Sequence, residues 1–494
     1  MNNHFLKEGV NWALLAVCCL PLISAGELAA ILGVAHSTAS RQLKRLEEQG
    51  LVESVVMGAL LPAAARYHLT PAGAKQFLEP EVYFQLPRNI NRLAAMLPAV
   101  ECFYRTAAWL PSNTQIGEFR SFHWRLRDGV DAVAHYENGS VAFVWSGPWQ
   151  TAKHFESRLE DFANSDSVAA GWPALVCVIA SDFWQTFRVT NAVSGFGLGE
   201  GWMVACTETD EIIGDLTLSS PPNFLGVRPL LGAEGNTVST ELPRMLRGVR
   251  AGKDAHMAHR VLCWVEQFPA AQIASIARAL GSHRRYVSAT VARLVKDGTL
   301  AQCEGHLYLA DEALKLSAHR DRVHVSRLRR RFGLRDDGLP AAARYRSHDG
   351  AASGIVATFK GAGFPVAGGW RGEDYSGGQN AIAPDALILM GDGFSGRVNW
   401  WCFEYERRAN SAASVSKKLR GYLARREASR VLVAARNPTM ADEFRRQAAA
   451  ASYPLLAASI QDIRIEEPQN VWGTQTVWKD AAGISATLRP PQWK

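Results

Sequence analysis

One short pattern occurs twice in the chain, and it restricts the fold more than any other feature. Six residues of the pattern are found again 248 positions later in the chain, so the two copies align with no insertion or deletion. The first set is Leu32, Gly33, Ser40, Arg45, Leu46 and Gly50, and the second is Leu280, Gly281, Ser288, Arg293, Leu294 and Gly298. Glycine ends helices because it adopts the left-handed conformation without strain. The pattern therefore predicts, in two places, two helices joined by a short turn.

The residues around the first copy predict the elements that complete it. Ser24 and Glu27 have the spacing of a capping box, which begins a helix. A second helix is expected from His36 to Gln49. The segments 51–56 and 66–70 alternate as the two strands of a hairpin do, and another helix is expected to follow them.

The second copy predicts the same order, with helices at 271–280 and 282–297 and a short hairpin at 300–309. Helix, turn, helix and hairpin is the order of a winged helix-turn-helix. We therefore expect one such module at residues 1–80 and another at 255–316. The segments Leu43–Val52 and Leu69–Gly73 resemble the corresponding parts of MarR-like and related winged-helix proteins.

A winged helix reads DNA through short polar and basic side chains on its second helix, because these reach base edges and phosphates in the major groove. The expected DNA-binding residues are His36, Ser37, Thr38, Arg41, Gln42 and Lys44 in the first module and His283, Arg284, Arg285, Tyr286 and Thr290 in the second. The alternative is a module that binds protein, with its charges merely solvated. Arg284 and Arg285 beside Tyr286 favour nucleic acid for the second module.

Composition agrees with a folded, mildly basic protein. Hydrophobic residues make up 47% and charged residues 20% of the chain, and the net charge is +7. The eight cysteines contain no Cys-x-x-Cys pair, which argues against zinc and favours free thiols in a reducing compartment. The apolar segment Val10–Ile23 is too short to span a membrane. We expect a cytoplasmic protein without membrane contact.

Behind the second module the pattern is mixed α/β. Strands are expected at 386–390, 398–406 and 431–434, with helices at 415–423 and 440–450. The order of Pro384-Asp385, a strand carrying Glu404 and Glu406, and a helix resembles the PD-(D/E)XK nuclease core.

That resemblance implies a metal site. Asp385 and Glu404 match its acidic positions and would hold Mg²⁺ or Mn²⁺, which activates water against a phosphodiester. Glu406 stands where the core has a lysine, which puts catalysis in doubt. Lys417 on the next helix would substitute if it turned inward. The favoured interpretation is a nuclease-like fold without nuclease activity, for which no cofactor is implied.

The whole second half resembles the replication-relaxation family of bacterial plasmids and mobile elements. The resemblance covers about residues 255–475. It rests on the winged helix, a basic helix at 322–332, and the motif residues Trp370, Glu373, Asp385, Glu404, Glu406, Lys417, Lys418, Leu419 and Tyr422.

The first half repeats this plan. Asp131 precedes an apolar strand as Asp385 does, and Val144 and Ser146 replace both glutamates. The expected fold is therefore mixed α+β: a tandem duplication of a winged helix followed by a PD-(D/E)XK-like α/β domain. The α/β domains are expected at 85–235, where the core is degenerate, and at 320–485, with a linker at 236–254. The alternative to duplication is that any α/β domain would show such apolar strands and amphipathic helices.

The favoured function is a non-enzymatic protein that binds double-stranded DNA through two heads, as a pseudo-dimer. The resemblance implies a role in replication, transfer or transcriptional control of a plasmid or mobile element. A metal-dependent DNA endonuclease using Asp385 and Glu404 is the first alternative, and a protein-binding winged-helix scaffold is the second. A homodimer and other DNA-processing proteins stay open as partners.

Overall fold

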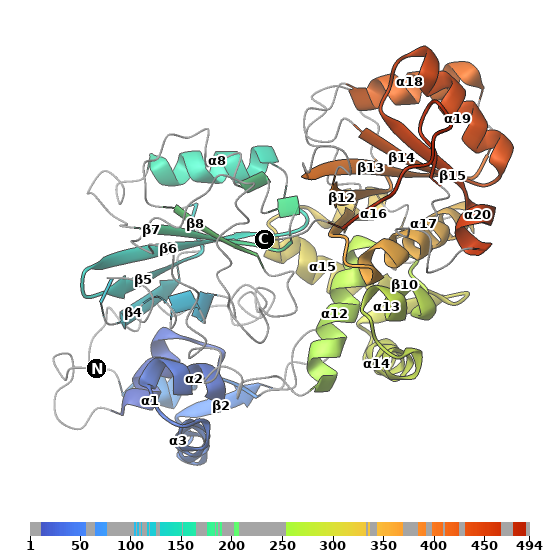
Figure 1. Cartoon of the computed structure of the whole chain (residues 1–494). Helices are drawn as coiled ribbons and strands as arrows, with labels where there is room; N and C mark the ends of the chain where they lie inside the picture. The colour runs from blue at the N-terminus through green and yellow to red at the C-terminus, as the bar shows by residue number, and fades with distance from the viewer. Residues whose placement is uncertain are drawn as a thin grey trace. The chain divides into compact units, whose positions relative to one another are not determined.

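The structure, a computed structural model of all 494 residues, divides into two compact units. Unit 1 comprises Met1–His259 and Leu316–Val323, and unit 2 comprises Arg260–Lys315 and His324–Lys494 (Figure 1). The residues that the structure describes are 11–55, 65–76, 103–104, 106–107, 110, 116–117, 119–124, 129–150, 152–164, 175–182, 184–185, 188–189, 202–206, 253–331, 334–335, 343–368, 384–391, 398–408, 411–423, 430–465 and 478–490.

Unit 1 begins with the expected winged helix-turn-helix. Its elements are α1 (Trp12–Cys19), β1 (Ile23–Ser24), α2 (Ala25–Leu32), α3 (His36–Glu48), β2 (Val52–Val55), β3 (Arg66–Leu69) and α4 (Pro71–Ala74). The capping box is confirmed: the Ser24 amide donates to Glu27 Oε2 at 2.7 Å, and Ser24 Oγ accepts from the Glu27 amide. Gly33 ends α2 with a φ of 64°, a left-handed conformation that a side chain would strain.

A second set of elements follows the same order of helices and hairpin strands, without a counterpart of β1. It contains α12 (Lys253–Gln267), α13 (Ile273–Ala279), α14 (Arg284–Lys296), β9 (Leu300–Cys303), β10 (His306–Leu309) and α15 (Asp311–Arg320). Most of it belongs to unit 2, whereas the start of α12 up to His259 and the end of α15 from Leu316 belong to unit 1. The basic helix expected at 322–332 is α16 (Val325–Arg331). It begins later than predicted because Arg322, with a φ of 58°, has a left-handed backbone conformation that a helix does not allow. Gly281, with a φ of 58°, stands between α13 and α14 as Gly33 stands between α2 and α3.

Each unit also contains a five-stranded sheet. In unit 1 it is formed by β4 (Phe119–Trp124), β5 (Ala132–Tyr136), β6 (Gly139–Ser146), β7 (Leu175–Ala180) and β8 (Trp202–Cys206), with helix α8 (Ala152–Ala163). In unit 2 it is formed by β11 (Val366–Gly368), β12 (Ala386–Gly391), β13 (Val398–Glu406), β14 (Arg430–Ala435) and β15 (Leu455–Ser459), with helices α17 (Ala343–Gly361), α18 (Ala412–Leu423), α19 (Pro438–Ala450) and α20 (Ile460–Ile465). In unit 2 the sequence predicts only the three central strands, β12, β13 and β14, and not the edge strands.

The two sheets share strand order, strand direction and register. In both, the strands lie in chain order, the first two pairs are antiparallel and the last two are parallel. Ala132 lies opposite Phe143 as Ala386 lies opposite Phe403. Val144 therefore occupies, in the register of unit 1, the position that Glu404 has in unit 2.

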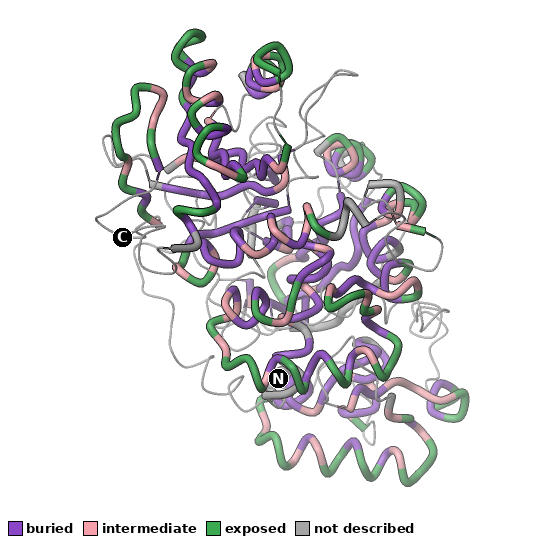
Figure 2. The backbone as a smooth tube through the Cα atoms, turned by 90° about the vertical axis from the view of Figure 1, so that its right-hand side faces the viewer, coloured by how far each residue is buried: buried purple, intermediate pink, exposed green. Residues whose placement is uncertain are grey.

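Helices cover the sheet of unit 2, and the central strands are buried on both faces. In Figure 2 these strands are purple, whereas helices are green along their outer side. Helix α17 packs against both the sheet and α13 of the winged helix, and a Cβ atom on its Gly361 would lie 2.6 Å from the Arg278 carbonyl oxygen. The winged helix and the sheet of unit 2 thus share one helix.

Some expectations lie outside the described residues. These are the motif residues Trp370 and Glu373 and the linker at 236–254 up to residue 252, since α12 begins at Lys253. No helix in the described part of the chain is long and apolar enough to cross a membrane.

Candidate nucleic-acid interface and acidic cluster

Helix α3 separates an apolar face from a polar one. Ala39, Leu43 and Leu46 are buried in the core of unit 1. Of the residues expected to read DNA on this helix, Thr38 is half-buried and the others are exposed, namely His36, Ser37, Arg41, Gln42 and Lys44. The exposed face therefore carries the polar and basic side chains that contact with DNA requires.

Helix α14 is built in the same way and is more basic. His283 caps its N-terminus by accepting a hydrogen bond from the Arg285 amide at 3.2 Å, and Arg284 and Arg285 are exposed in the first turn. Tyr286 is half-buried beside them. One expectation is wrong here: Thr290 is only 4% exposed and donates to the Tyr286 carbonyl oxygen, so it does not belong to the exposed face.

The expected acidic residues of unit 2 meet at the end of β13. Glu404 and Glu406 point to the same side of the strand, and both carboxylates bind the ammonium of Lys418 on α18, with 2.5 Å between Lys418 Nζ and Glu404 Oε2. Asp385 precedes β12 and accepts a hydrogen bond from the Tyr405 amide at 2.7 Å. Lys417, the lysine that the sequence analysis assigned to this site, is exposed. The lysine of the cluster is its neighbour Lys418.

His348, which no sequence pattern predicts, lies on α17 beside Asp385. Its Nε2 is 3.0 Å from the Tyr405 carbonyl oxygen and 3.6 Å from Asp385 Oδ2, and its Nδ1 is 3.1 Å from Asp349 Oδ1. No local sequence motif marks this histidine, because the residues it contacts on β13 lie far along the chain, with Tyr405 57 residues later. The acidic cluster, as the name is used below, comprises Asp385, Glu404, Glu406, Lys418 and His348.

Burial and charge perturb the titration of the acidic cluster. Burial raises the pKa of Glu404 to about 8, against the opposing charge of Lys418, and it also raises the pKa of Asp385. Burial lowers the pKa of His348, but the hydrogen bond to Asp349 and the negative charge of Asp385 outweigh it and raise this pKa to about 9. The glutamates likewise hold the pKa of Lys418 above its ordinary value despite burial. Lys418 and His348 are therefore the cations of the cluster at neutral pH.

The cluster as it stands fits an ammonium ion better than a divalent metal. Glu404 and Glu406 are both bound to Lys418, and Asp385 Oδ2 is bound to a backbone amide. Glu404 Oε1 is the exception, since it is buried without a hydrogen-bond partner. Within the described residues no group of three or more His, Cys, Asp and Glu side chains is arranged to hold a metal ion. No catalytic step through a metal follows from this arrangement.

Comparison with known proteins identifies one part of the chain. The model of a helix-turn-helix domain family matches residues 21–55, which contain α2, α3 and β2. No curated protein and no solved structure is significantly similar to the chain. The N-terminal module is thus a helix-turn-helix domain, a type of domain that indicates DNA binding.

Proposed function

We propose that the protein binds double-stranded DNA through two winged helix-turn-helix modules, with α3 and α14 as the recognition helices. The match of residues 21–55 to a helix-turn-helix domain, together with the exposed polar face of α3, carries this proposal. The major groove, about 12 Å wide, admits a helix of this kind. Helix α14 contains four Arg and Lys residues and no acidic residue, which suits it to a phosphate backbone.

We further propose that the chain is an internal duplication of one winged helix and one α/β domain. Support comes from the repeated pattern at Leu32–Gly50 and Leu280–Gly298 and from the common strand order and register of the two sheets. On this proposal Asp131 is the counterpart of Asp385. A single chain then carries two DNA-reading heads, which would act in the cytoplasm. The role in replication, transfer or transcription of a mobile element rests on the resemblance of residues alone.

The test of DNA binding is the salt dependence of affinity for a random duplex, measured by fluorescence anisotropy with the full chain. Each phosphate contact contributes about 0.9 to the slope of log K against log salt. Replacing Arg284 and Arg285 with alanine should lower the slope by up to about 2. The matched control, Arg446→Ala with Lys479→Ala, removes the same charge from exposed positions outside the winged helix.

The same experiment with Arg41→Ala and Lys44→Ala addresses the first module. Unchanged affinity and slope in both pairs of variants would overturn the assignment of the recognition helices. A wild-type protein without affinity for random duplex would favour the alternative, a scaffold whose winged helices bind protein.

A metal-dependent DNA endonuclease is the second candidate, favoured by one observation. Glu404 Oε1 is buried without a hydrogen-bond partner, so this oxygen is available to bind a metal ion. For Mg²⁺ or Mn²⁺ to bind Asp385 and Glu404, Lys418 would have to release Glu404. Calorimetry with Mn²⁺ and nicking of a supercoiled plasmid test this. Binding and cleavage that Asp385→Ala abolishes would establish the enzyme, and their absence would leave a DNA-binding protein.

A further inference from the structure

A short segment late in the chain belongs to unit 1. Residues 316–323, here called the strap, are grouped with unit 1, although the residues before and after them belong to unit 2. The strap contains the last residues of α15 and the three residues after that helix. It therefore joins the first α/β domain although it follows the second winged helix in sequence.

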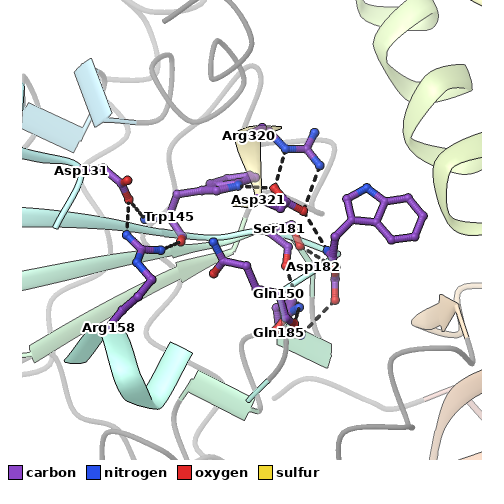
Figure 3. A network of polar contacts seen from close by, with 11 residues as sticks. Asp131, Trp145, Gln150, Arg158, Ser181, Asp182, Gln185, Arg320 and Asp321 are labelled. Carbon is purple, nitrogen blue, oxygen red and sulfur yellow. Dashed lines mark hydrogen bonds and ion pairs between the residues drawn. The ribbon is translucent and has the colours of Figure 1, made fainter. Parts of the chain in front are cut away.

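Asp321 anchors the strap in the interior of unit 1. Its side chain is 0% exposed and accepts hydrogen bonds from Trp145 Nε1 at 3.0 Å and from the Trp149 amide at 2.8 Å (Figure 3). Arg320 pairs with the same carboxylate at 2.7 Å and also lies over the Trp145 ring. At Gly147 an added Cβ atom would lie 1.9 Å from Asp321 Oδ1, so only glycine leaves room for the anchor.

The strap also completes the charge balance of Asp131. This carboxylate is 1% exposed and is bound by two arginines, with 2.9 Å to Arg158 NH2 on α8 and 2.6 Å to Arg322 NH2 on the strap. It also accepts from the Trp145 amide at 2.7 Å. A buried carboxylate that loses one of these partners would become costly, so the strap contributes directly to the stability of unit 1.

The corresponding site in unit 2, around Asp385, has different charged side chains. Arg158 follows Ser146 by twelve residues, as Lys418 follows Glu406, so the two cations hold equivalent positions on α8 and α18. In unit 2 the cation binds two glutamates, whereas in unit 1 Val144 and Ser146 take their places and Arg158 turns to Asp131. The strap supplies the second cation in unit 1, where His348 does so in unit 2.

We propose that this degenerate site of unit 1 is the receptor for the strap, and that the seated strap tethers α15, the helix that follows the second wing, to unit 1. The strap is then a conformational latch within the chain: its release would loosen unit 1 and free the end of α15. This inference depends on the contacts within unit 1 and not on the proposed DNA binding.

Limited trypsin digestion of the full chain tests the latch, because Arg320 and Arg322 are themselves trypsin sites. In the wild type, cleavage after these residues should be slower than at exposed sites such as Arg327 by at least tenfold. Asp321→Asn should speed cleavage after Arg320 and Arg322. Lys315→Ala, an exposed change on the same helix before the strap, should not.

Hydrogen exchange measured by mass spectrometry separates release from global unfolding. In Asp321→Asn and Arg322→Gln, exchange should rise in peptides of β5, β6 and α15 while α14 keeps its wild-type protection, and Arg322→Lys should restore part of the protection. Rapid wild-type cleavage after Arg320 and Arg322 would overturn the proposal. So would exchange and cleavage that Asp321→Asn and Arg322→Gln leave unchanged.

Discussion

Replacing Lys418 with methionine tests whether one buried ammonium holds the acidic cluster together. Methionine keeps most of the length and packing of the lysine stem and removes only the charge and its hydrogen bonds. Lys417→Met is the matched control, because the neighbouring lysine is exposed and carries the same charge. The two variants therefore differ only in whether the lost ammonium faced Glu404 and Glu406.

The expected loss follows from the burial of the two carboxylates. The side chains of Glu404 and Glu406 are 5% and 9% exposed, and that of Lys418 is 25% exposed. Removing one partner of a buried ion pair typically costs about 3–5 kcal/mol. The partial exposure of Lys418 admits some water, so the lower part of that range is expected. Lys417→Met should change the free energy of unfolding by no more than about 0.5 kcal/mol.

The pH dependence of this loss has a definite sign. Lys418 lowers the pKa of Glu404, which burial raises, so its removal lets the folded carboxyl hold a proton to higher pH. A protonated carboxyl needs no ammonium, so the deficit of Lys418→Met should be smaller near pH 5 than near pH 8 and should continue to grow above pH 8, where Glu404 ionises in the folded wild type.

Hydrogen exchange of peptides from β13 and β14, measured in the full chain at both pH values, gives the local free energy of opening. Equal protection in Lys418→Met and Lys417→Met at pH 8 would refute the reasoning. A larger deficit at pH 5 than at pH 8 would refute it too.

Three further experiments test buried groups, one in the wild type and two in variants. The wild-type free energy of unfolding of unit 2 should fall between about pH 5 and pH 8, because the raised pKa of Glu404 means that the folded state binds its proton more tightly than the unfolded state does; urea denaturation across that range would show it, and a rise would contradict it. Arg66→Met should destabilise the first winged helix by about 3–5 kcal/mol, because it strands the carboxylate of Glu27, which is 1% exposed; adding Glu27→Gln should recover part of the loss in thermal unfolding. Gly147→Ala should destabilise unit 1 by at least about 1–3 kcal/mol, since its Cβ atom would overlap Asp321; calorimetry showing an unchanged transition would contradict the close contact.

Local patterns predicted much of the secondary structure. The capping box at Ser24, the strand 398–406 and the helix-ending Gly33 all occur as expected, because each is governed by hydrogen bonds and backbone preferences within a few residues. The edge strands were missed. β11 and β15 are short, and their place in the sheet depends on partners that are distant in sequence.

Two errors could have been avoided by counting along the helices. Lys418 lies three residues after Val415 and four before Tyr422, both buried, so it shares their face of α18, whereas Lys417 does not. Thr290 stands in the same relation to Val287 and Leu294 on α14, which explains its burial. Helical spacing favours the correct residue in both cases.

The strap could not have been predicted from local patterns. Asp321 binds Trp145, which lies 176 residues earlier, and Arg322 binds Asp131, which lies 191 residues earlier. Neither strap residue belongs to an apolar stripe or a recognisable motif. Such pairs arise only from the tertiary fold, which brings a late segment into an early domain.

The comparison between the two sheets bears on the purpose of the acidic cluster. Unit 1 forms the same strand order and register with Val144 and Ser146 where unit 2 has Glu404 and Glu406. Burying two carboxylates against one ammonium is rarely better for stability than apolar side chains of similar size. The sheet therefore does not require these glutamates. One explanation for them is a ligand of unit 2, and the Mn²⁺ and nicking experiments, more than any measurement of stability, decide between a DNA-binding protein and a nuclease.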